Sequence, residues 1–170
     1  PYLNYNRSLN YINGIKSISK KLGAGINVGL NKSKDKKYDF SVNNEFLFNN
    51  SHTTGTGTNH YNTNTVTLNA TVYYKKVWSV SSDYQFYSRQ KTTQFAEGIN
   101  NSLWSAKLQR TFKSNEFTAY IKVRDILNQN IGIDRTFDGN TFTEIQNERL
   151  KRYFLVGFAW DFKNKAKKTK

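Results

Sequence analysis

The 170-residue sequence contains no cysteine, no methionine and a single proline. The absence of cysteine excludes disulfide bridges, cysteine-ligated zinc and thiol catalysis. No segment approaches the ~18 consecutive apolar residues that a membrane-spanning helix requires. The near absence of proline suits long uninterrupted β-strands, because proline cannot donate a hydrogen bond to a strand ladder. A disulfide-stapled domain and a helical membrane protein are therefore both excluded.

The chain is rich in aromatic residues for its polarity. Aromatic residues make up 15% and hydrophobic residues 36% of the sequence. This content is too aromatic for a disordered chain. It is typical of a transmembrane barrel with a wet interior, in which only every second residue is apolar. A soluble all-β domain with one solvated face has a similar composition, so composition leaves both classes open.

Apolar and polar residues alternate with a period of two in seven segments, which is the pattern of β-strands with one apolar face. The seven segments are 22–30, 38–48, 66–74, 78–86, 104–112, 117–127 and 152–162, and 8–19 is a weaker eighth. Each is roughly ten residues long, about what a tilted strand needs to cross a bilayer. Soluble sheets usually have strands of about five or six residues. Strand length therefore favours a membrane barrel.

The connections between these segments alternate between short and long. The short ones are 34–37, 75–76 and 113–116, and the long ones are 49–64, 89–101 and 128–151. Outer-membrane barrels have tight periplasmic turns and long extracellular loops, which produces this alternation. A Greek-key sandwich has no reason for it. The loops thus predict an up-and-down barrel.

The last strand carries the most pronounced apolar face. We predict that its lipid-facing row consists of Phe154, Val156, Phe158, Trp160 and Phe162. Polar residues dominate the opposite face of the strands, where we expect a wet interior: Asn27, Glu45, Thr67, Asn69, Asp83, Gln85, Lys107, Gln109, Lys122 and Arg124. Two charged residues, Arg110 and Asp125, interrupt the apolar face. Both lie near strand ends, where a charge costs about 0–1 kcal/mol.

The predicted fold is all-β: an antiparallel up-and-down transmembrane β-barrel, with about eight strands present as part of a larger barrel. Residues 1–162 are expected to form the barrel segment and residues 163–170 a basic C-terminal tail. The chain begins at Pro1 without a basic and apolar leader, and we interpret it as a fragment or processed form of a longer protein.

The net charge of +14 raises the question of nucleic-acid binding. The lysines, however, concentrate in short links and in the tail, as in 32–37, 75–76 and 163–170. Solvated turns explain the links, and the tail is suited to anionic lipid headgroups. We therefore predict outer-membrane lipid, and no nucleic acid, as a partner.

No residues form a recognisable catalytic or metal-binding pattern. His52 and His60 share a loop without a carboxylate, and the acidic residues of 128–151 fit no calcium-loop spacing. We predict no enzyme activity, no cofactor, no metal site and no catalytic residue. Candidate ligand contacts are the loop aromatics and the basic residues of the interior: Tyr61, Phe95, Phe137, Phe142, Lys107, Lys122 and Arg124.

Three segments carry a family resemblance. Residues 101–112 (NSLWSAKLQRTF), 123–130 (VRDILNQN) and 151–162 (KRYFLVGFAWDF) resemble the C-terminal barrel segment of Bacteroidetes outer-membrane β-barrel proteins. This group is similar to the TonB-dependent receptors. The resemblance implies a bacterial outer-membrane location and a barrel of about twenty-two strands. It also implies a plug, and a TonB-contacting region in an N-terminal part that this chain does not include.

By the same resemblance, the barrel-assembly machinery is a partner that reads a terminal aromatic. Here eight residues follow Phe162, so the chain departs from that pattern. The implied function is TonB-dependent uptake of an unidentified nutrient, with this segment supplying wall and ligand-facing loops. Two alternatives remain open: a stand-alone eight-stranded outer-membrane barrel for adhesion or membrane integrity, and a soluble glycan-binding β-sandwich.

Overall fold

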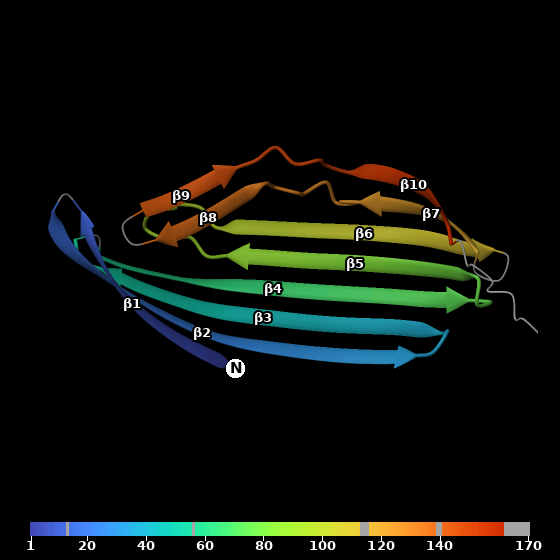
Figure 1. The fold of residues 1–170 in the computed structure, drawn as a ribbon, viewed down its shortest axis with the longest axis horizontal. Coiled ribbons are helices and arrows are strands. Elements are labelled where there is room, and N and C mark those ends of the chain that lie inside the picture. The colour runs from blue at the N-terminus through green and yellow to red at the C-terminus, as the bar shows by residue number, and fades with distance from the viewer. Residues whose placement is uncertain (13, 56, 113–115, 139–140, 162–170) are drawn as a thin grey trace, which may run out of the picture.

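The chain folds into one long antiparallel sheet whose eight strands are arranged almost in sequence order (Figure 1). The computed structural model describes residues 1–12, 14–55, 57–112, 116–138 and 141–161. The strands of the sheet are β1 (Tyr2–Ile12), β2 (Ile15–Lys34), β3 (Tyr38–Thr53), β4 (Gly57–Tyr74), β5 (Trp78–Arg89), β6 (Ile99–Phe112), β7 (Phe117–Arg124) and β10 (Tyr153–Trp160). A separate hairpin, β8 (Ile133–Asp138) and β9 (Thr141–Gln146), lies between β7 and β10 in the chain. The prediction of an antiparallel all-β meander is confirmed.

The sheet is open within the described residues. Strands β1 and β10 form its two edges and are not hydrogen-bonded to each other. A bilayer core offers no water to bond an exposed strand edge, so in a membrane both edges require strand partners. The described residues therefore form an open wall, and the closure of the larger barrel that the sequence predicts is not seen among them.

Three strands are much longer than predicted. Strands β2, β3 and β4 contain 20, 16 and 18 residues. The predicted loop 49–64 is wrong, because β3 and β4 stay paired as far as Thr53 and Gly57. The single strand predicted at 8–19 is also wrong, because the chain reverses near Gly14 between β1 and β2. Residues 49–64 are mostly polar on both faces of the strands, which in a sequence is typical of a loop, although the backbone there remains paired.

Two of the short connections are confirmed as tight turns. Lys75 and Lys76 both have positive φ angles, 49° and 60°, and the amide of Val77 donates to the carbonyl of Tyr74 at 3.3 Å. Positive φ at both central positions defines the type I′ hairpin turn. The turn at 34–37 closes through the Lys37 amide and the Lys34 carbonyl at 2.9 Å. Most of the third short connection, 113–116, lies outside the described residues.

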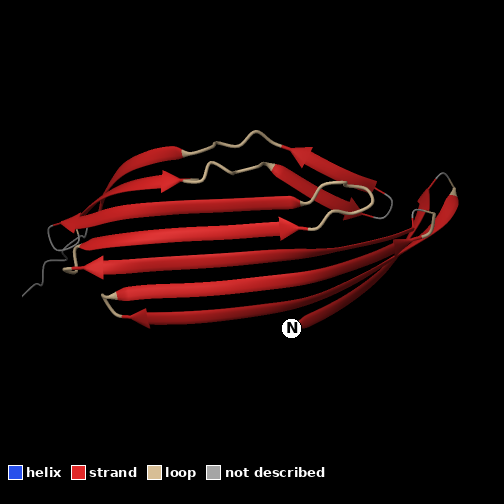
Figure 2. Ribbon diagram, turned by 180° about the vertical axis from the view of Figure 1, so that it is seen from behind, coloured by secondary structure: helices blue, strands red, loops and turns tan. Residues whose placement is uncertain are grey.

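The short turns lie together at one end of the sheet, and the β1–β2 tip, the β3–β4 tip and β8–β9 lie at the other, which we call the upper rim (Figures 1 and 2). The strands that follow the short turns begin at Tyr38, Trp78 and Phe117, which align with Leu108, Arg110 and Phe112 of β6. The lower edge thus shifts by one residue per strand. With ~3.4 Å per residue and ~4.8 Å between strands, the shift corresponds to a tilt of about 35°, as in transmembrane barrels.

The register confirms the two predicted faces. Directly opposed residues of an antiparallel ladder point to the same side. One row of the apolar face consists of Val156, Ile121, Leu108, Val80 and Val72. In the last strand, Phe154, Val156, Phe158 and Trp160 are 69%, 82%, 66% and 52% exposed, respectively. Phe162 lies outside the described residues.

Polar side chains on the apolar face bond to one another. The indole Nε1 of Trp104 donates to Ser82 Oγ at 2.9 Å, and Asn44 Nδ2 donates to Asn64 Oδ1 at 2.7 Å. Exposed polar groups in water gain little from such pairing, whereas in an apolar medium an unpaired polar group is costly. Arg110, at the lower edge of this face, lies over the rings of Trp78 and Phe112 at 4.9 and 4.6 Å. The pairing fits a face that contacts lipid.

The second charged residue assigned to the apolar face, Asp125, does not belong to it. Strand β7 ends at Arg124, and Asp125 has a φ of 52° and is 4% exposed. The sequence pattern extended the strand to Leu127, but this positive φ ends the extended conformation. That part of the prediction is wrong.

Gly157 lies beneath an aromatic ring. It is opposite Tyr120 on the polar face, and a Cβ at position 157 would overlap the Tyr120 ring. We expect Gly157→Val to displace the ring and destabilise the protein by about 1–3 kcal/mol, a typical cost of overpacking. Urea unfolding in lipid vesicles measures the difference. Ala159→Val, on the same face and strand, is the control; equal effects of both changes would contradict the packing argument.

Candidate ligand site beside the β8–β9 hairpin

The segment 128–151, predicted as a long connection, contains the β8–β9 hairpin. The hairpin packs at the upper rim against the polar face, as contacts from β8 to Arg89 of β5 demonstrate. Six residue pairs join its two strands, from Ile133–Gln146 to Asp138–Thr141. The long connection predicted at 128–151 is confirmed, and the hairpin within it, which was not predicted, covers part of the polar face.

Asp125 begins the segment that leads to the hairpin. Its carboxylate accepts hydrogen bonds from the amides of Gln129 and Asn130 at 3.0 and 3.1 Å, and its carbonyl accepts one from the Asn128 amide at 2.9 Å. Asn128 Oδ1 in turn accepts from the amide of Arg152 at 3.1 Å. Asp and Asn tolerate positive φ and bond nearby backbone groups, which explains these residue types. The turn thereby joins both ends of the segment.

Arg89 anchors the hairpin to the wall. It is 6% exposed at the end of β5, and its Nη1 donates to the carbonyl of Arg135 in β8 at 2.5 Å. Its guanidinium lies 4.1 Å from the ring centroid of Tyr61 in β4. Such stacking suits arginine, whose planar charge is weakly hydrated. One basic side chain thus connects β4, β5 and the hairpin.

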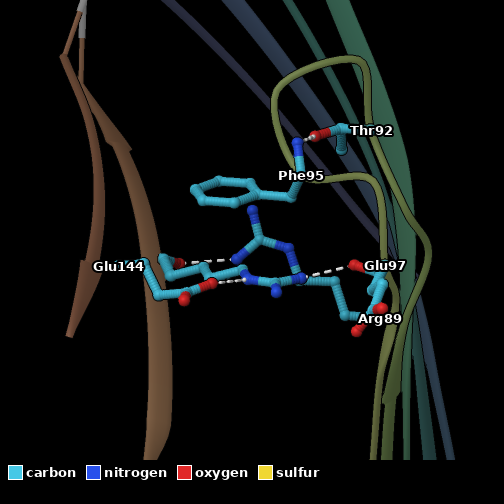
Figure 3. A network of polar contacts seen from close by, with 6 residues as sticks. Arg89, Thr92, Phe95, Glu97 and Glu144 are labelled. Atoms are coloured by element: carbon cyan, nitrogen blue, oxygen red, sulfur yellow. Dashed lines mark hydrogen bonds and ion pairs between the residues drawn. The ribbon is translucent and has the colours of Figure 1, made fainter. Parts of the chain in front are cut away.

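Arg135 extends the network across the hairpin, because it bonds to Glu144 and Glu97, which are labelled in Figure 3. Its Nε donates to Glu144 Oε2 at 2.6 Å, and its Nη1 donates to the carbonyl of Glu97 at 2.5 Å. Its guanidinium lies 4.6 Å from the ring centroid of Phe95, and that ring meets Phe142 edge-on at 6.4 Å. The β5–β6 connection and the hairpin are therefore held together by both charge and aromatic contacts.

A cavity of about 460 Å³ lies between the hairpin and the polar face of β5 and β6. Its lining combines branched apolar side chains, amides, a phenol, a hydroxyl, a carboxylate and two arginines: Gln85, Tyr87, Ile99, Asn101, Leu103, Ile131, Ile133, Asp134, Arg135, Thr136 and Arg149. The Oδ1 atom of Asn101 is buried without a hydrogen-bond partner among the described residues. Small-molecule sites are concave and use polar groups to orient the ligand, and here four branched apolar residues are combined with seven polar or charged ones.

The structure brings together some of the predicted ligand contacts. Tyr61, Phe95 and Phe142 surround the two arginines of the network. Phe137 pairs with Phe142 through its backbone, and its side chain lies outside the described part of the structure. Tyr61, Phe95 and Phe142 thus support the hairpin and are not among the lining residues of the cavity.

The predicted basic contacts lie lower on the polar face. Lys107 and Lys122 are directly opposed, and neither lines the cavity beneath the hairpin. Arg124 lines a neighbouring cavity of about 280 Å³, together with Tyr153 and Arg149. The prediction missed Arg89, although its odd position continues the inward-facing series Gln85 and Tyr87 of β5. It missed Arg135 because nothing in the sequence indicates where a loop residue will pack.

The two histidines lie on the paired β3–β4 extension rather than in a loop. His52 Nδ1 lies 3.0 Å from Thr58 Oγ1 on the opposing strand. Over the described ranges, no three His, Cys, Asp or Glu side chains gather as metal ligands would. Likewise, no helix in the described part of the chain has the length and apolarity to cross a bilayer.

Loss of the Arg135 side chain should allow the β8–β9 hairpin to open away from the β5–β6 connection more often. We expect Arg135→Ala to speed trypsin cleavage at Arg149 about tenfold, because loss of about 1.4 kcal/mol raises the open population tenfold. Glu144→Gln should have a smaller effect, since an amide still accepts the hydrogen bond. Digestion of the folded protein followed by mass spectrometry measures both rates. Unchanged cleavage in folded Arg135→Ala would show that the network does not restrain the hairpin.

The antiparallel meander, the tilt of its strands and its separate apolar and polar faces define the class of outer-membrane β-barrel proteins. The family described as "Outer membrane protein beta-barrel family" matches residues 10–160, and the chain belongs to it. No curated protein and no solved structure matches the chain. The protein resides in the bacterial outer membrane. The alternative of a soluble glycan-binding β-sandwich is therefore wrong, because the strands form a single meander in a membrane family.

Proposed function

We propose that this chain forms part of the wall of an outer-membrane receptor that takes up a nutrient with energy supplied through TonB. The observation that carries the proposal is the cavity of about 460 Å³ between the β8–β9 hairpin and the polar face. A simple structural barrel has no need for a hairpin anchored over its interior. A receptor needs ligand-binding groups at the mouth of the barrel, on the side that meets the cell exterior.

The chemistry of the cavity suggests its ligand class. Branched apolar residues such as Leu103 and Ile133 suit a carbon skeleton, and the unpartnered Oδ1 of Asn101 accepts a hydrogen bond from an N–H or O–H group. The Arg149–Asp134 ion pair, at 3.4 Å and largely exposed, adds both charge signs. A small oligosaccharide or short peptide fits this set better than a purely anionic cargo. The partners of the receptor would include outer-membrane lipid and the barrel-assembly machinery.

The receptor proposal is tested with the full-length protein. Detergent-purified protein should retain the periplasmic domain of TonB in a pull-down, and a strain lacking TonB should lose uptake of the nutrient. Nutrient binding at the mouth of the barrel is tested with two variants. Asn101→Leu should lower the affinity for the nutrient, whereas Ser79→Leu, low on the polar face, should not. Failure to bind TonB by a folded full-length protein would contradict the proposal.

A second candidate is the stand-alone eight-stranded barrel for adhesion or membrane integrity. The described sheet contains eight strands, which is the smallest usual number for a transmembrane barrel. Because the chain has no cysteine of its own, any disulfide within it must join two introduced cysteines. Leu3→Cys on β1 can be combined in turn with cysteines at Phe154, Val156 and Phe158 on β10. A disulfide in any pair of the membrane-inserted full chain supports the eight-stranded barrel, and none is expected in a larger receptor.

A further inference from the structure

The outer side of the upper rim carries a row of basic residues on three adjacent strands. Arg7 of β1 is directly opposite Lys20 of β2, and Lys20 is directly opposite His52 of β3. We call Arg7, Lys20 and His52 the outer basic row. The paired β3–β4 extension continues the row to Thr58, whose Oγ1 lies 3.0 Å from His52 Nδ1.

Burial shows that the row points outward. Ser51 and Thr53, which flank His52, are 8% and 1% exposed, and Ser19 beside Lys20 is 2% exposed. Arg7, Lys20 and His52 are themselves exposed. Successive side chains of a strand alternate between faces. The outer basic row therefore lies on the same side of the sheet as the apolar face.

Below the row the same face becomes apolar, and one step beyond the row Leu9 and Ile18 form a further apolar pair. Two steps below it, Leu3, Ala24 and Phe48 form an all-apolar row, and one step below it Tyr5 and Leu22 are joined by Asn50. Four residues along a strand tilted by about 35° correspond to a rise of about 11 Å. Interfacial layers flank the ~30 Å apolar core of a bilayer. Basic side chains near the edge of the apolar core extend their charged groups into this interfacial layer.

The row has no local counter-charge. Arg7 and Lys20 are like charges in directly opposed positions, an arrangement that destabilises a sheet. The sequence contains no Asp or Glu within 1–34 or 46–82, so the strands of the row supply no carboxylate at this end. An anion placed between the two side chains would convert their repulsion into attraction. The arrangement is favourable only if something outside the chain provides that anion.

We propose that the outer basic row binds the phosphate groups of glycolipid headgroups in the outer leaflet of the membrane. A phosphate monoester carries up to two negative charges and accepts the hydrogen bonds that Arg, Lys and His donate. Free phosphate has the same chemistry. The row faces the lipid side of the wall rather than the interior, which favours a phosphate that is attached to lipid.

The test uses the full-length protein in nanodiscs that contain lipid A with or without its phosphates. Wild-type protein should bind phosphorylated lipid A about 25-fold more tightly than Arg7→Gln/Lys20→Gln, since each basic residue contributes about fivefold. The two forms should bind dephosphorylated lipid A equally. Lys36→Gln/Lys75→Gln, with the same charge change at the opposite rim, should match wild type. Native mass spectrometry of lipid-bound protein provides the readout.

The unfolding temperature gives a second readout, because the effect of Arg7→Gln on it should differ between neutral detergent and phosphorylated lipid A. In neutral detergent, Arg7→Gln should leave the unfolding temperature unchanged or raised, because it removes a repulsion. In phosphorylated lipid A the same change should lower it, and Arg7→Lys should restore it. A comparable loss in the Lys36→Gln/Lys75→Gln control, or equal binding of phosphorylated and dephosphorylated lipid, would overturn the proposal. Competition by millimolar inorganic phosphate as effective as lipid A would assign the row to free anions instead.

Discussion

Val156→Arg should destabilise the membrane-inserted protein by about 2–4 kcal/mol, the cost of a basic side chain near the bilayer midplane. Val156 is 82% exposed, the highest value in the row of Phe154, Val156, Phe158 and Trp160. Replacing Val156 removes few contacts within the chain, so the loss of stability would come from placing the new charge in lipid. Urea unfolding in lipid vesicles measures the free energy. Phe158→Arg should behave similarly and also lose the ring contact to Phe117 at 5.7 Å.

The matched control is Ala159→Arg, which places the same side chain on the same strand but on the polar face, opposite Thr118. Water reaches that face in a barrel interior, so its expected cost is within about 0.5 kcal/mol. If Val156→Arg were as well tolerated as this control, the exposed row would face something other than lipid. The comparison also separates a general effect of added charge from the effect of the surrounding medium.

Asp125→Ala should lower the local stability of the segment before β8 by about 3–5 kcal/mol. The change removes a 4% exposed carboxylate that accepts hydrogen bonds from the amides of Gln129 and Asn130. Each hydrogen bond to a charged group is worth about 1.5–3 kcal/mol. Alanine also tolerates the φ of 52° less well than aspartate does. Hydrogen exchange of peptides covering 126–135 should reveal the loss of amide protection.

Asp125→Asn should have roughly half that effect, because asparagine tolerates positive φ and retains one acceptor oxygen. Asp134→Ala is the control for loss of an acidic residue in the same segment. Its ion pair with Arg149 spans 3.4 Å, and both side chains are about half exposed, so its expected contribution is at most ~1 kcal/mol. Equal exchange in the Asp125 and Asp134 variants would show that the buried carboxylate does not hold the turn.

Where apolar and polar residues alternate, the sequence predicted the structure well. Val72, Val80 and Leu108 lie in one row of the apolar face, as the alternation indicates. The pattern is informative there because shifting a strand by one residue would exchange its faces. The lysine-containing turns at 34–37 and 75–76 were predicted for a similar reason, since they separate two strongly alternating segments.

Sequence reasoning failed where both faces of a strand are polar. Residues 49–64 contain mostly Asn, Thr, His, Ser and Gly, which predicts a loop, yet most of them continue β3 and β4. Backbone hydrogen bonds hold these strands together and do not depend on an apolar pattern. The same limit applies to β8 and β9. Their position over the polar face depends on Arg89 and Arg135, two residues far apart in the chain.

The sequence by itself determined the class of the protein: strands that present one face to an apolar medium and one to water, joined alternately by short and long links. That follows because the period of a strand and the cost of unpaired polar groups in lipid are local properties. Only the tertiary structure decided how far the strands extend, that Asp125 closes a turn and that Arg7, Lys20 and His52 form one row. Register and long-range contacts fix these features, and no short stretch of sequence contains them.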